Sequence, residues 1–336
     1  MHFDVFNPYS NQDVTSFYVD VVIDALKHAS HSVSRISSLS SVKAAEDRGI
    51  VVVSPMDVGR IKRYGYKKVI LWVQGLLAEE SYMRNKSKSR YIALSCVCKW
   101  ALQHADLTLM VSEAMADFYR TRHKVRLGRY FVMPCFNVEL PSQFDFDPIG
   151  RKRGNTFLYA GSLEPWQCFE ETVRLYGEIE KHVPDAHLLV LTSEFEKAKN
   201  VLEGHGIRRH TIDCVDRSSF GERVQMVKYG FCLREDNPVN NVSTPTKLSS
   251  YVANGVIPIY STAIKDFSRV ARQSEFCIPI SDFPANNEML SRIIDSCRKS
   301  VRAELLYEDF HKAFGQYYSR NSYIDRLADE IRESGF

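Results

Sequence analysis

The alternation of short apolar runs with longer amphipathic segments constrains the fold of this 336-residue chain more than any other feature. Runs such as residues 50–53 and 69–72 are continuously apolar and rich in β-branched residues, which is typical of strands covered on both faces. The first half of the chain predicts strands at residues 2–6, 50–53, 69–72 and 107–111 and helices at residues 14–29 and 91–104. Strands that alternate with helices in this way indicate an α/β fold with a parallel sheet.

The pattern lapses between residues 135 and 154, where two prolines, two glycines and mixed charge leave no apolar period. It then restarts, with strands expected at residues 157–159, 187–191, 211–215, 230–233, 256–260 and 276–280 and helices expected at residues 168–182, 194–202, 220–228, 246–253, 286–302, 305–314 and 323–333. One core rarely extends over a chain of this length, so we expect two doubly wound, Rossmann-like domains facing a central cleft.

The predicted domains are residues 1–145, residues 146–318 and a C-terminal helix at residues 319–336 that packs back on the first domain. The last helices have no strands between them, which is why the final one is free to cross back. The serine-rich stretch at residues 30–41 predicts a mobile loop.

The formal net charge of +3 gives little reason to expect a nucleic-acid partner, but the positive charge is concentrated in the first half of the chain. Basic clusters interleaved with aromatic residues lie at residues 60–68, 84–90 and 120–129. They are either solvated loop ends or a surface for an anionic membrane or a lipid-diphosphate substrate.

The eight cysteines are scattered, and we expect all of them to be reduced thiols, mostly buried. Residues 1–10 have polar interruptions and no stretch is long and apolar enough to cross a bilayer, so we expect neither a signal peptide nor a transmembrane helix. A cytoplasmic protein, free or peripheral at the inner face of the cell membrane, is the expected result.

Two loops follow predicted strands in the second half, at the strand ends where parallel sheets bind ligands. The first is YAGSLEPWQ at residues 159–167, where Gly161 permits an anion to approach the backbone closely. The alternative is an ordinary turn from strand to helix with a packed tryptophan.

The second loop runs from Leu233 to Lys247 and joins a buried strand to the next helix. Arg234 emerges at the strand end, where its planar guanidinium suits two phosphate oxygens. Thr244 is the expected helix cap, and Lys247 lies in the first turn beside the free amide groups. Two cations beside a helix N-terminus predict a diphosphate site. A solvated loop of asparagine and serine is the alternative.

The sequences YAGSLEPWQ and LREDNPVNNVSTPTKLSSYVANGVIPI (residues 233–259) resemble the donor half of glycosyltransferase family 4 and its bacterial surface-polysaccharide relatives, which have the GT-B fold. In the first half, VILWVQGLLAEESYMR, HADLTLMVSEAMADFY and YFVMPCFNV resemble the acceptor domain of that group. The resemblance covers nearly the whole chain, and its most specific part is the TPTK...YVANGVIPI block.

This resemblance implies transfer of a sugar from a UDP- or GDP-linked donor to a glycan or polyprenyl-diphosphate-linked acceptor, with retention of anomeric configuration. It implies a role in the biosynthesis of O-antigen, capsule or exopolysaccharide. The donor-binding residues that the resemblance and the two loops give together are Gly161, Ser162, Trp166, Gln167, Glu235, Asn240, Asn241, Ser243, Thr244, Pro245, Thr246 and Ser250.

The chain departs from the family pattern at three positions. Family members commonly have an arginine and a lysine on the donor diphosphate where this chain has Ser162 and Gln167. Many also have a ribose-binding glutamate where this chain has Ser250. Arg234 and Lys247 are the candidates to replace the missing positive charge. A catalytically inactive, nucleotide-binding scaffold of a polysaccharide assembly complex is the alternative function.

The leaving nucleotide diphosphate gains negative charge, which something must stabilise. We find no Asp-x-Asp motif near a strand end, because Asp145 and Asp147 fall in the predicted linker. We therefore expect no metal and no other cofactor, with Arg234, Lys247 and helix amide groups stabilising the charge.

On the acceptor side, Gln74 and Gly75 follow a strand end and Glu79 and Glu80 come soon after. Glu80 is the candidate to orient or deprotonate the acceptor. Alternatively, both glutamates simply begin a helix, where they interact favourably with its dipole. An NAD-dependent enzyme is disfavoured, since the first strand is not followed by a Gly-x-Gly-x-x-Gly element.

Overall fold

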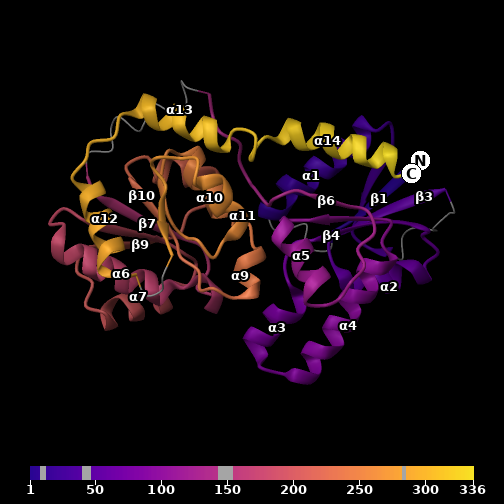
Figure 1. Cartoon of the computed structure of the whole chain (residues 1–336), viewed down its shortest axis with the longest axis horizontal. Helices are drawn as coiled ribbons and strands as arrows, with labels where there is room; N and C mark the ends of the chain where they lie inside the picture. The colour runs from indigo at the N-terminus through magenta and orange to yellow at the C-terminus, as the bar shows by residue number, and fades with distance from the viewer. Residues whose placement is uncertain (8–12, 40–46, 143–153, 282–284) are drawn as a thin grey trace. The chain divides into compact units, whose positions relative to one another are not determined.

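The computed structural model describes residues 1–7, 13–39, 47–142, 154–281 and 285–336, and it divides into two compact units (Figure 1). Unit 1 contains Met1–Asn137, Asn241–Thr244 and Ser319–Phe336, and unit 2 contains Val138–Asn240 and Pro245–Tyr318. The boundary predicted between residues 145 and 146 lies outside the described residues.

Unit 1 is built on a six-stranded parallel sheet in the order β2-β1-β3-β4-β5-β6. Its strands are β1 (His2–Phe6), β2 (Ser32–Ile36), β3 (Arg48–Val52), β4 (Lys68–Val73), β5 (Leu107–Met110) and β6 (Tyr130–Val132). The central strands β4 and β5 are almost entirely buried, because helices cover both faces, as their continuous apolar runs predicted.

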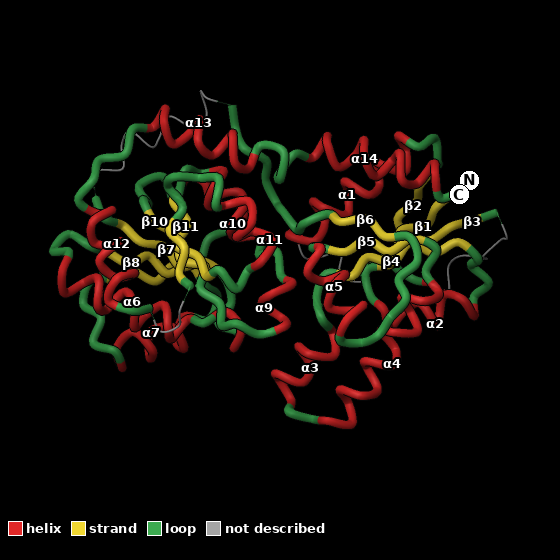
Figure 2. The backbone as a smooth tube through the Cα atoms, viewed as in Figure 1, coloured by secondary structure: helices red, strands yellow, loops and turns green. Residues whose placement is uncertain are grey.

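The helices of unit 1 are α1 (Asp13–His28), α2 (Pro55–Arg63), α3 (Leu77–Asn85), α4 (Lys88–His104), α5 (Glu113–Thr121) and α14 (Arg320–Glu333). Figure 2 shows α1 and α14 on one face of the sheet and α2, α4 and α5 on the other. Helix α14 packs on α1, and Arg320 forms an ion pair with Asp24. The prediction that the last helix crosses back to the first half is confirmed.

The predicted mobile loop at residues 30–41 is wrong for residues 32–36. Residues 32–36 form β2, an edge strand whose Ser32 pairs in register with His2 of β1. Its side chains are exposed or half-buried, so the strand needs no apolar pattern, and the serines concealed it from a search based on hydrophobicity. Residues 40 and 41 lie outside the described part of the chain.

Unit 2 is built on a second six-stranded parallel sheet, in the order β12-β11-β10-β7-β8-β9. Its strands are β7 (Thr156–Ala160), β8 (His187–Leu191), β9 (His210–Asp213), β10 (Tyr229–Cys232), β11 (Ile257–Ser261) and β12 (Ile278–Ile280). The rings of Phe157, Tyr229 and Phe231 stack in its core, at centroid distances of 5.0 and 5.5 Å from Phe157.

The helices of unit 2 are α6 (Phe169–His182), α7 (Phe195–Gly204), α8 (Phe220–Arg223), α9 (Pro238–Val242, ending in unit 1), α10 (Thr246–Ala253), α11 (Lys265–Ala271), α12 (Asn287–Cys297) and α13 (Ala303–Phe314), with short 3-10 turns at Pro165–Gln167 and Arg217–Ser219. The expected α/β class with two doubly wound parallel sheets is confirmed.

All eight cysteines are free thiols, and only Cys96 and Cys214 are exposed. Within the described residues, no helix has both the length and the apolar character needed to span a bilayer.

Candidate functional site

The chain order of the second sheet places a ligand-binding edge between β7 and β10. From β7 the chain moves outward through β8 and β9, and it then returns to the other side of β7 to add β10 and β11. In open parallel sheets this reversal leaves a crevice at the carboxyl ends of the two strands. The two loops singled out in the sequence, after Tyr159 and after Leu233, both leave the sheet here.

Arg234 is fixed at this edge by hydrogen bonds at both ends of the residue. Its backbone N–H donates to Ser261 Oγ at 2.8 Å. Its Nη1 donates to the carbonyl oxygens of Leu233 at 2.8 Å and Gln167 at 3.2 Å, and its Nη2 donates to Gln167 Oε1 at 2.6 Å. The residue is only 3% exposed. The guanidinium is therefore held in one place without a charged partner.

Lys247 extends from the first turn of α10 toward the same point. Its Nζ donates to Gln167 Oε1 at 3.0 Å and lies 4.5 Å from the centroid of the Tyr159 ring. Burial of the ammonium, with the nearby Arg234 charge as a second cause, lowers the pKa of Lys247 to about 7. At physiological pH, Lys247 is therefore deprotonated in a fraction of the molecules. A bound anion would favour the protonated, charged form.

Gly161 leaves room for the lysine at the turn after β7. Its φ of +124° is a backbone conformation that residues other than glycine rarely adopt. A Cβ at this position would lie 3.4 Å from Lys247 Nζ. Its N–H donates to Leu191 O at 2.9 Å and so continues the pairing of β7 with β8. The glycine lets the backbone approach the cation closely.

The two cations therefore converge on the neutral oxygen of Gln167. Among the described residues, no carboxylate forms an ion pair with Arg234 or Lys247. Two partly dehydrated positive charges on one acceptor repel one another, and a multiply charged anion would offset that cost. This cation pair, Arg234 with Lys247, is chemically suited to bind a diphosphate.

Other predicted donor residues surround the cation pair within unit 2. Ser162 accepts a hydrogen bond from the Tyr159 hydroxyl through its carbonyl, at 2.7 Å. Trp166 and Gln167 lie in the 3-10 turn that precedes α6. The carbonyl of Glu235 accepts from the Asn240 side-chain amide at 3.0 Å. Ser250 is buried in α10, one turn beyond Thr246.

Asn241, Ser243 and Thr244 belong to unit 1, unlike the cation pair. Thr244 Oγ1 accepts from the backbone N–H of Cys135 at 3.0 Å. The prediction that Thr244 caps the following helix is wrong, because Pro245 holds the cap position and no side chain caps this end. The hydroxyl is used instead to tie residues 241–244 to the rest of unit 1.

The predicted acceptor-side residues lie together in unit 1, where β4 leads into α3. Glu79 and Glu80 are in the first turn of α3, as the dipole interpretation required. The carboxylate of Glu80 lies against Gly75, where a Cβ would overlap Oε1. Gln74 Oε1 accepts from the Tyr18 hydroxyl at 3.5 Å, and its buried Nε2 has no hydrogen-bond partner in the described part of the chain.

Glu79 has partners that the sequence did not reveal. Its Oε1 accepts from the Tyr91 hydroxyl at 3.1 Å and contacts His123 Nε2 at 2.9 Å. Both the glutamate and the histidine side chains are largely buried. His123 follows α5 and no spacing links it to Glu79, so only the tertiary structure brings them together.

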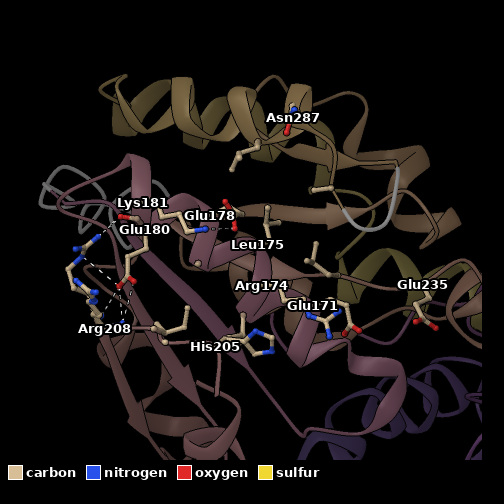
Figure 3. Close-up of a pocket in the computed structure, with 18 residues that line it drawn as sticks. Glu171, Arg174, Leu175, Glu178, Glu180, Lys181, His205, Arg208, Glu235 and Asn287 are labelled. Atoms are coloured by element: carbon tan, nitrogen blue, oxygen red, sulfur yellow. Dashed lines mark hydrogen bonds and ion pairs between the residues drawn. The ribbon is translucent and has the colours of Figure 1, made fainter. Parts of the chain in front are cut away.

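A cavity of about 860 Å³ lies along α6 in unit 2 (Figure 3). It is lined by charged residues of both signs, and Figure 3 shows Asn287 on one side, His205 and Arg208 on another, and Glu235 at one end. Leu233 and Glu235, the neighbours of Arg234 in the chain, also line it. The cavity therefore borders the loop that carries the cation pair.

No cluster of three or more histidine, cysteine, aspartate or glutamate side chains suited to a metal is found in the part of the chain that the structure describes. Asp145 and Asp147 lie outside that part.

The structure is similar to several solved glycosyltransferases. Sucrose-phosphate synthase from Thermosynechococcus elongatus matches with a TM-score of 0.72 and 13% identity, over 99% of this chain and 98% of that one. An Escherichia coli trehalose-6-phosphate structure with bound UDP-2-fluoro glucose matches with a TM-score of 0.62 and 10% identity, over 98% and 99% of the two chains. Staphylococcus aureus TarM, in complex with Fondaparinux, alpha-GlcNAc-glycerol and UDP, matches with a TM-score of 0.62 and 9% identity, over 87% of this chain and 57% of its own.

At the level of sequence, no protein-family model matches the chain, and no curated protein matches it. Identities this low establish the fold alone. The two parallel sheets with their helices, matched over almost the full length of both chains, therefore have the GT-B fold.

Proposed function

We infer that this chain is a glycosyltransferase that moves a sugar from a nucleotide-diphosphate sugar to a glycan or lipid-linked acceptor. The observation that carries the proposal is the cation pair at the carboxyl edge of the second sheet: Arg234 is buried, Lys247 is half-buried, and neither has a carboxylate partner among the described residues. A diphosphate supplies the negative charge that this arrangement lacks.

The same two side chains would serve the chemistry. When the bond between sugar and diphosphate breaks, the leaving group gains negative charge, and fixed cations nearby stabilise it more than they stabilise the intact donor. Arg234 is already fixed by its carbonyl acceptors, so little reorganisation is needed. We propose that the reaction needs no metal and retains the anomeric configuration, the latter from the family resemblance.

UDP is the favoured nucleotide, and GDP is the second. Two of the similar structures contain UDP or UDP-2-fluoro glucose. In this chain the base and ribose must be held without the usual glutamate, since Ser250 takes its position. Glu235, an exposed carboxylate of the donor loop that lines the neighbouring cavity, is our candidate for the ribose hydroxyls.

The acceptor is proposed to be a growing glycan or a polyprenyl-diphosphate-linked sugar, in the synthesis of O-antigen, capsule or exopolysaccharide. Glu80, beside Gly75 at the end of β4, would orient or deprotonate its hydroxyl. A lipid-linked acceptor would bring the protein to the inner face of the cell membrane, where the basic clusters of unit 1 would contact anionic lipid.

A non-catalytic nucleotide-binding scaffold is the second candidate. It is favoured by the loss of the usual arginine and lysine at Ser162 and Gln167. Both functions predict nucleotide binding, but only the enzyme predicts turnover.

Binding and turnover can be separated in one experiment. Thermal-shift screening against UDP- and GDP-sugars should identify the donor, because a ligand at one hundred times its dissociation constant stabilises the fold by roughly 2.7 kcal/mol. Hydrolysis of that donor and transfer to a lipid-linked acceptor are then measured with and without EDTA. A thermal shift without any turnover supports the scaffold, and the absence of a shift with every nucleotide contradicts both functions. Loss of turnover in EDTA, restored by magnesium, contradicts the metal-independent mechanism alone.

A further inference from the structure

The three basic clusters of unit 1 differ in how far acidic neighbours neutralise them. In the cluster at residues 120–129, Arg120 pairs with Asp117 at 3.3 Å and Arg129 pairs with Glu330 at 3.3 Å. In the cluster at residues 60–68, Lys62 pairs with Asp106 at 3.6 Å. The cluster at residues 84–90 continues into α4, a helix without acidic residues, whereas the other two clusters have acidic partners for some of their cations.

Helix α4 contains no acidic residue in its sequence KSRYIALSCVCKWALQH. Its three cations are Lys88, Arg90 and Lys99, all exposed, and no ion pair involves them within the described ranges. The whole chain has 44 basic and 41 acidic residues, so three uncompensated cations on one helix match its entire net charge of +3. The helix is a local positive surface on a nearly neutral protein.

The same helix exposes large apolar side chains. Ile92 is 61% exposed and Trp100 is 40% exposed, whereas Cys98, Ala101 and Leu102 on the opposite side are buried. Ile92 and Trp100 are separated by two helical turns, so they lie along one row that also contains the exposed Cys96. Apolar side chains that a globular protein would normally bury are thus presented beside the cations.

We propose that the exposed face of α4, with Lys88, Ile92, Cys96, Lys99 and Trp100 along it and Arg90 at its edge, docks on an anionic lipid bilayer. Cations flanking apolar and aromatic side chains on one helix face match the interfacial region of a membrane, where headgroups are negative and acyl chains begin. Tryptophan is particularly suited to that boundary, because its ring is apolar and its N–H is polar. The inference deepens the proposed lipid-linked acceptor and rests on it for its biological purpose.

The α4 row also explains why the helix has a weak amphipathic pattern. A helix that faces water with one side would carry mainly polar residues there, but the exposed side of α4 includes the apolar residues Ile92, Cys96 and Trp100 beside its cations. Trp100 is supported from below, since its ring stacks on His104 at 4.1 Å and lies over Gly59 of α2. These contacts hold the Trp100 ring in a fixed orientation.

The test is flotation of the full chain with vesicles, without donor or acceptor. The chain should bind phosphatidylcholine vesicles containing about 30% phosphatidylglycerol and not vesicles of phosphatidylcholine alone, and salt at about 0.5 M should weaken the binding. Replacing Lys88, Arg90 and Lys99 together with glutamine should reduce partitioning roughly 100-fold, at about fivefold for each cation near the surface. Glutamine keeps the helix propensity, so the fold should survive.

The matched control is the triple replacement of Lys265, Arg272 and Lys299 with glutamine. These two lysines and one arginine are exposed in unit 2 and give the same change in net charge. They should leave vesicle binding within about twofold of the unmodified protein, since charges away from the surface are screened. Equal loss in both triples would overturn the assignment to α4 and indicate a general charge effect.

Insertion of Trp100 into the bilayer can be measured separately by tryptophan fluorescence. Trp72 is buried and Trp166 lies in unit 2, so a blue shift of tryptophan emission on anionic vesicles should come from Trp100. Trp100→Phe should abolish the shift but keep binding, whereas Ile92→Ser with Trp100→Ser should weaken binding about tenfold or more.

Binding to RNA or heparin without vesicle binding would overturn the proposal in favour of a soluble polyanion. Transfer to a short soluble acceptor is measured separately. Failure of this transfer would count against the proposed enzyme. It would not affect the membrane proposal, which the vesicle-binding experiment tests independently.

Discussion

The carboxyl edges of the two sheets hold charge in opposite ways. In unit 2, Arg234 and Lys247 share the neutral oxygen of Gln167. In unit 1, Glu79 lies between Tyr91 and His123, and its Oε1 already has both of them as partners inside the protein. Internal partners stabilise a fold, whereas charges without an opposite partner reduce stability until a ligand arrives. The difference indicates that the unit 2 edge is arranged for an anion and that Glu79 is arranged for the structure.

Removing the arginine of the cation pair should cause the largest loss of activity. Arg234→Ala is expected to lower kcat/KM for the nucleotide sugar by about 100- to 1000-fold, the effect of losing one fixed electrostatic group from an active site. Steady-state kinetics measure the loss, and thermal melting verifies the fold. Arg234→Lys should recover part of the activity. Full activity in Arg234→Ala would contradict the proposed diphosphate site.

The two adjacent glutamates of unit 1 should respond differently. Glu80→Gln is expected to lower kcat about 100-fold with little change in donor KM, as loss of a general base would. Gly75→Ala should reproduce this loss, because a Cβ at residue 75 would displace the Glu80 carboxylate. Glu79→Gln should instead keep kcat and lower the free energy of unfolding by about 1 kcal/mol, through weaker bonds to Tyr91 and His123. An unchanged turnover number in Glu80→Gln removes it from the chemistry.

Placing a carboxylate between the two cations should sharpen the comparison. Gln167→Glu would give Arg234 and Lys247 an internal carboxylate partner. The donor diphosphate would then have to compete with that carboxylate for the two cations. We expect donor affinity, measured by calorimetry, to fall about tenfold or more while the melting temperature is unchanged or higher. Gln167→Ala is the control and should weaken affinity far less. Equal affinity in the glutamate variant and the unmodified chain would show that the donor phosphates bind elsewhere.

The lowered pKa of Lys247 predicts the direction in which stability and kcat/KM change with pH. We expect this to be the smallest of the four effects. Folding lowers this pKa from 10.5 to about 7, so between these values the unfolded chain holds the proton and the folded chain releases it. The free energy of unfolding should therefore rise with pH across this window, relative to Lys247→Met. Donor kcat/KM should fall as pH rises above about 7, because the ammonium is lost. Parallel pH profiles for the two proteins, in stability and in kcat/KM, would contradict a buried, titrating Lys247.

Local signals in the sequence were sufficient for most of the fold. Strand β8 and helix α10 match the predicted residues 187–191 and 246–253, because a dense apolar run and a proline before a helical period mark them. Strand β2 was missed because an edge strand exposed to water carries no apolar alternation. Periodicity reports burial, so it detects only elements that are buried.

The candidate site was predictable in position but not in its contacts. Strand ends and the loop composition located Arg234 and Lys247, since the topology of a parallel sheet fixes where ligands can bind. Their common contact with Gln167, far away in the sequence, depends on side-chain conformations that no spacing encodes. For the same reason, His123 could not be assigned to Glu79 from the sequence.

Helix α14 packs on α1, although the whole of unit 2 lies between them in the sequence. During translation, α1 therefore leaves the ribosome long before its partner helix exists, and the side of α1 that α14 covers stays exposed while all of unit 2 is made. Unit 2 is nearly complete by Tyr318 and can fold in the meantime. The N-terminal unit is thus the later of the two to be finished, and a chain that stops before Arg320 would keep an aggregation-prone helix exposed.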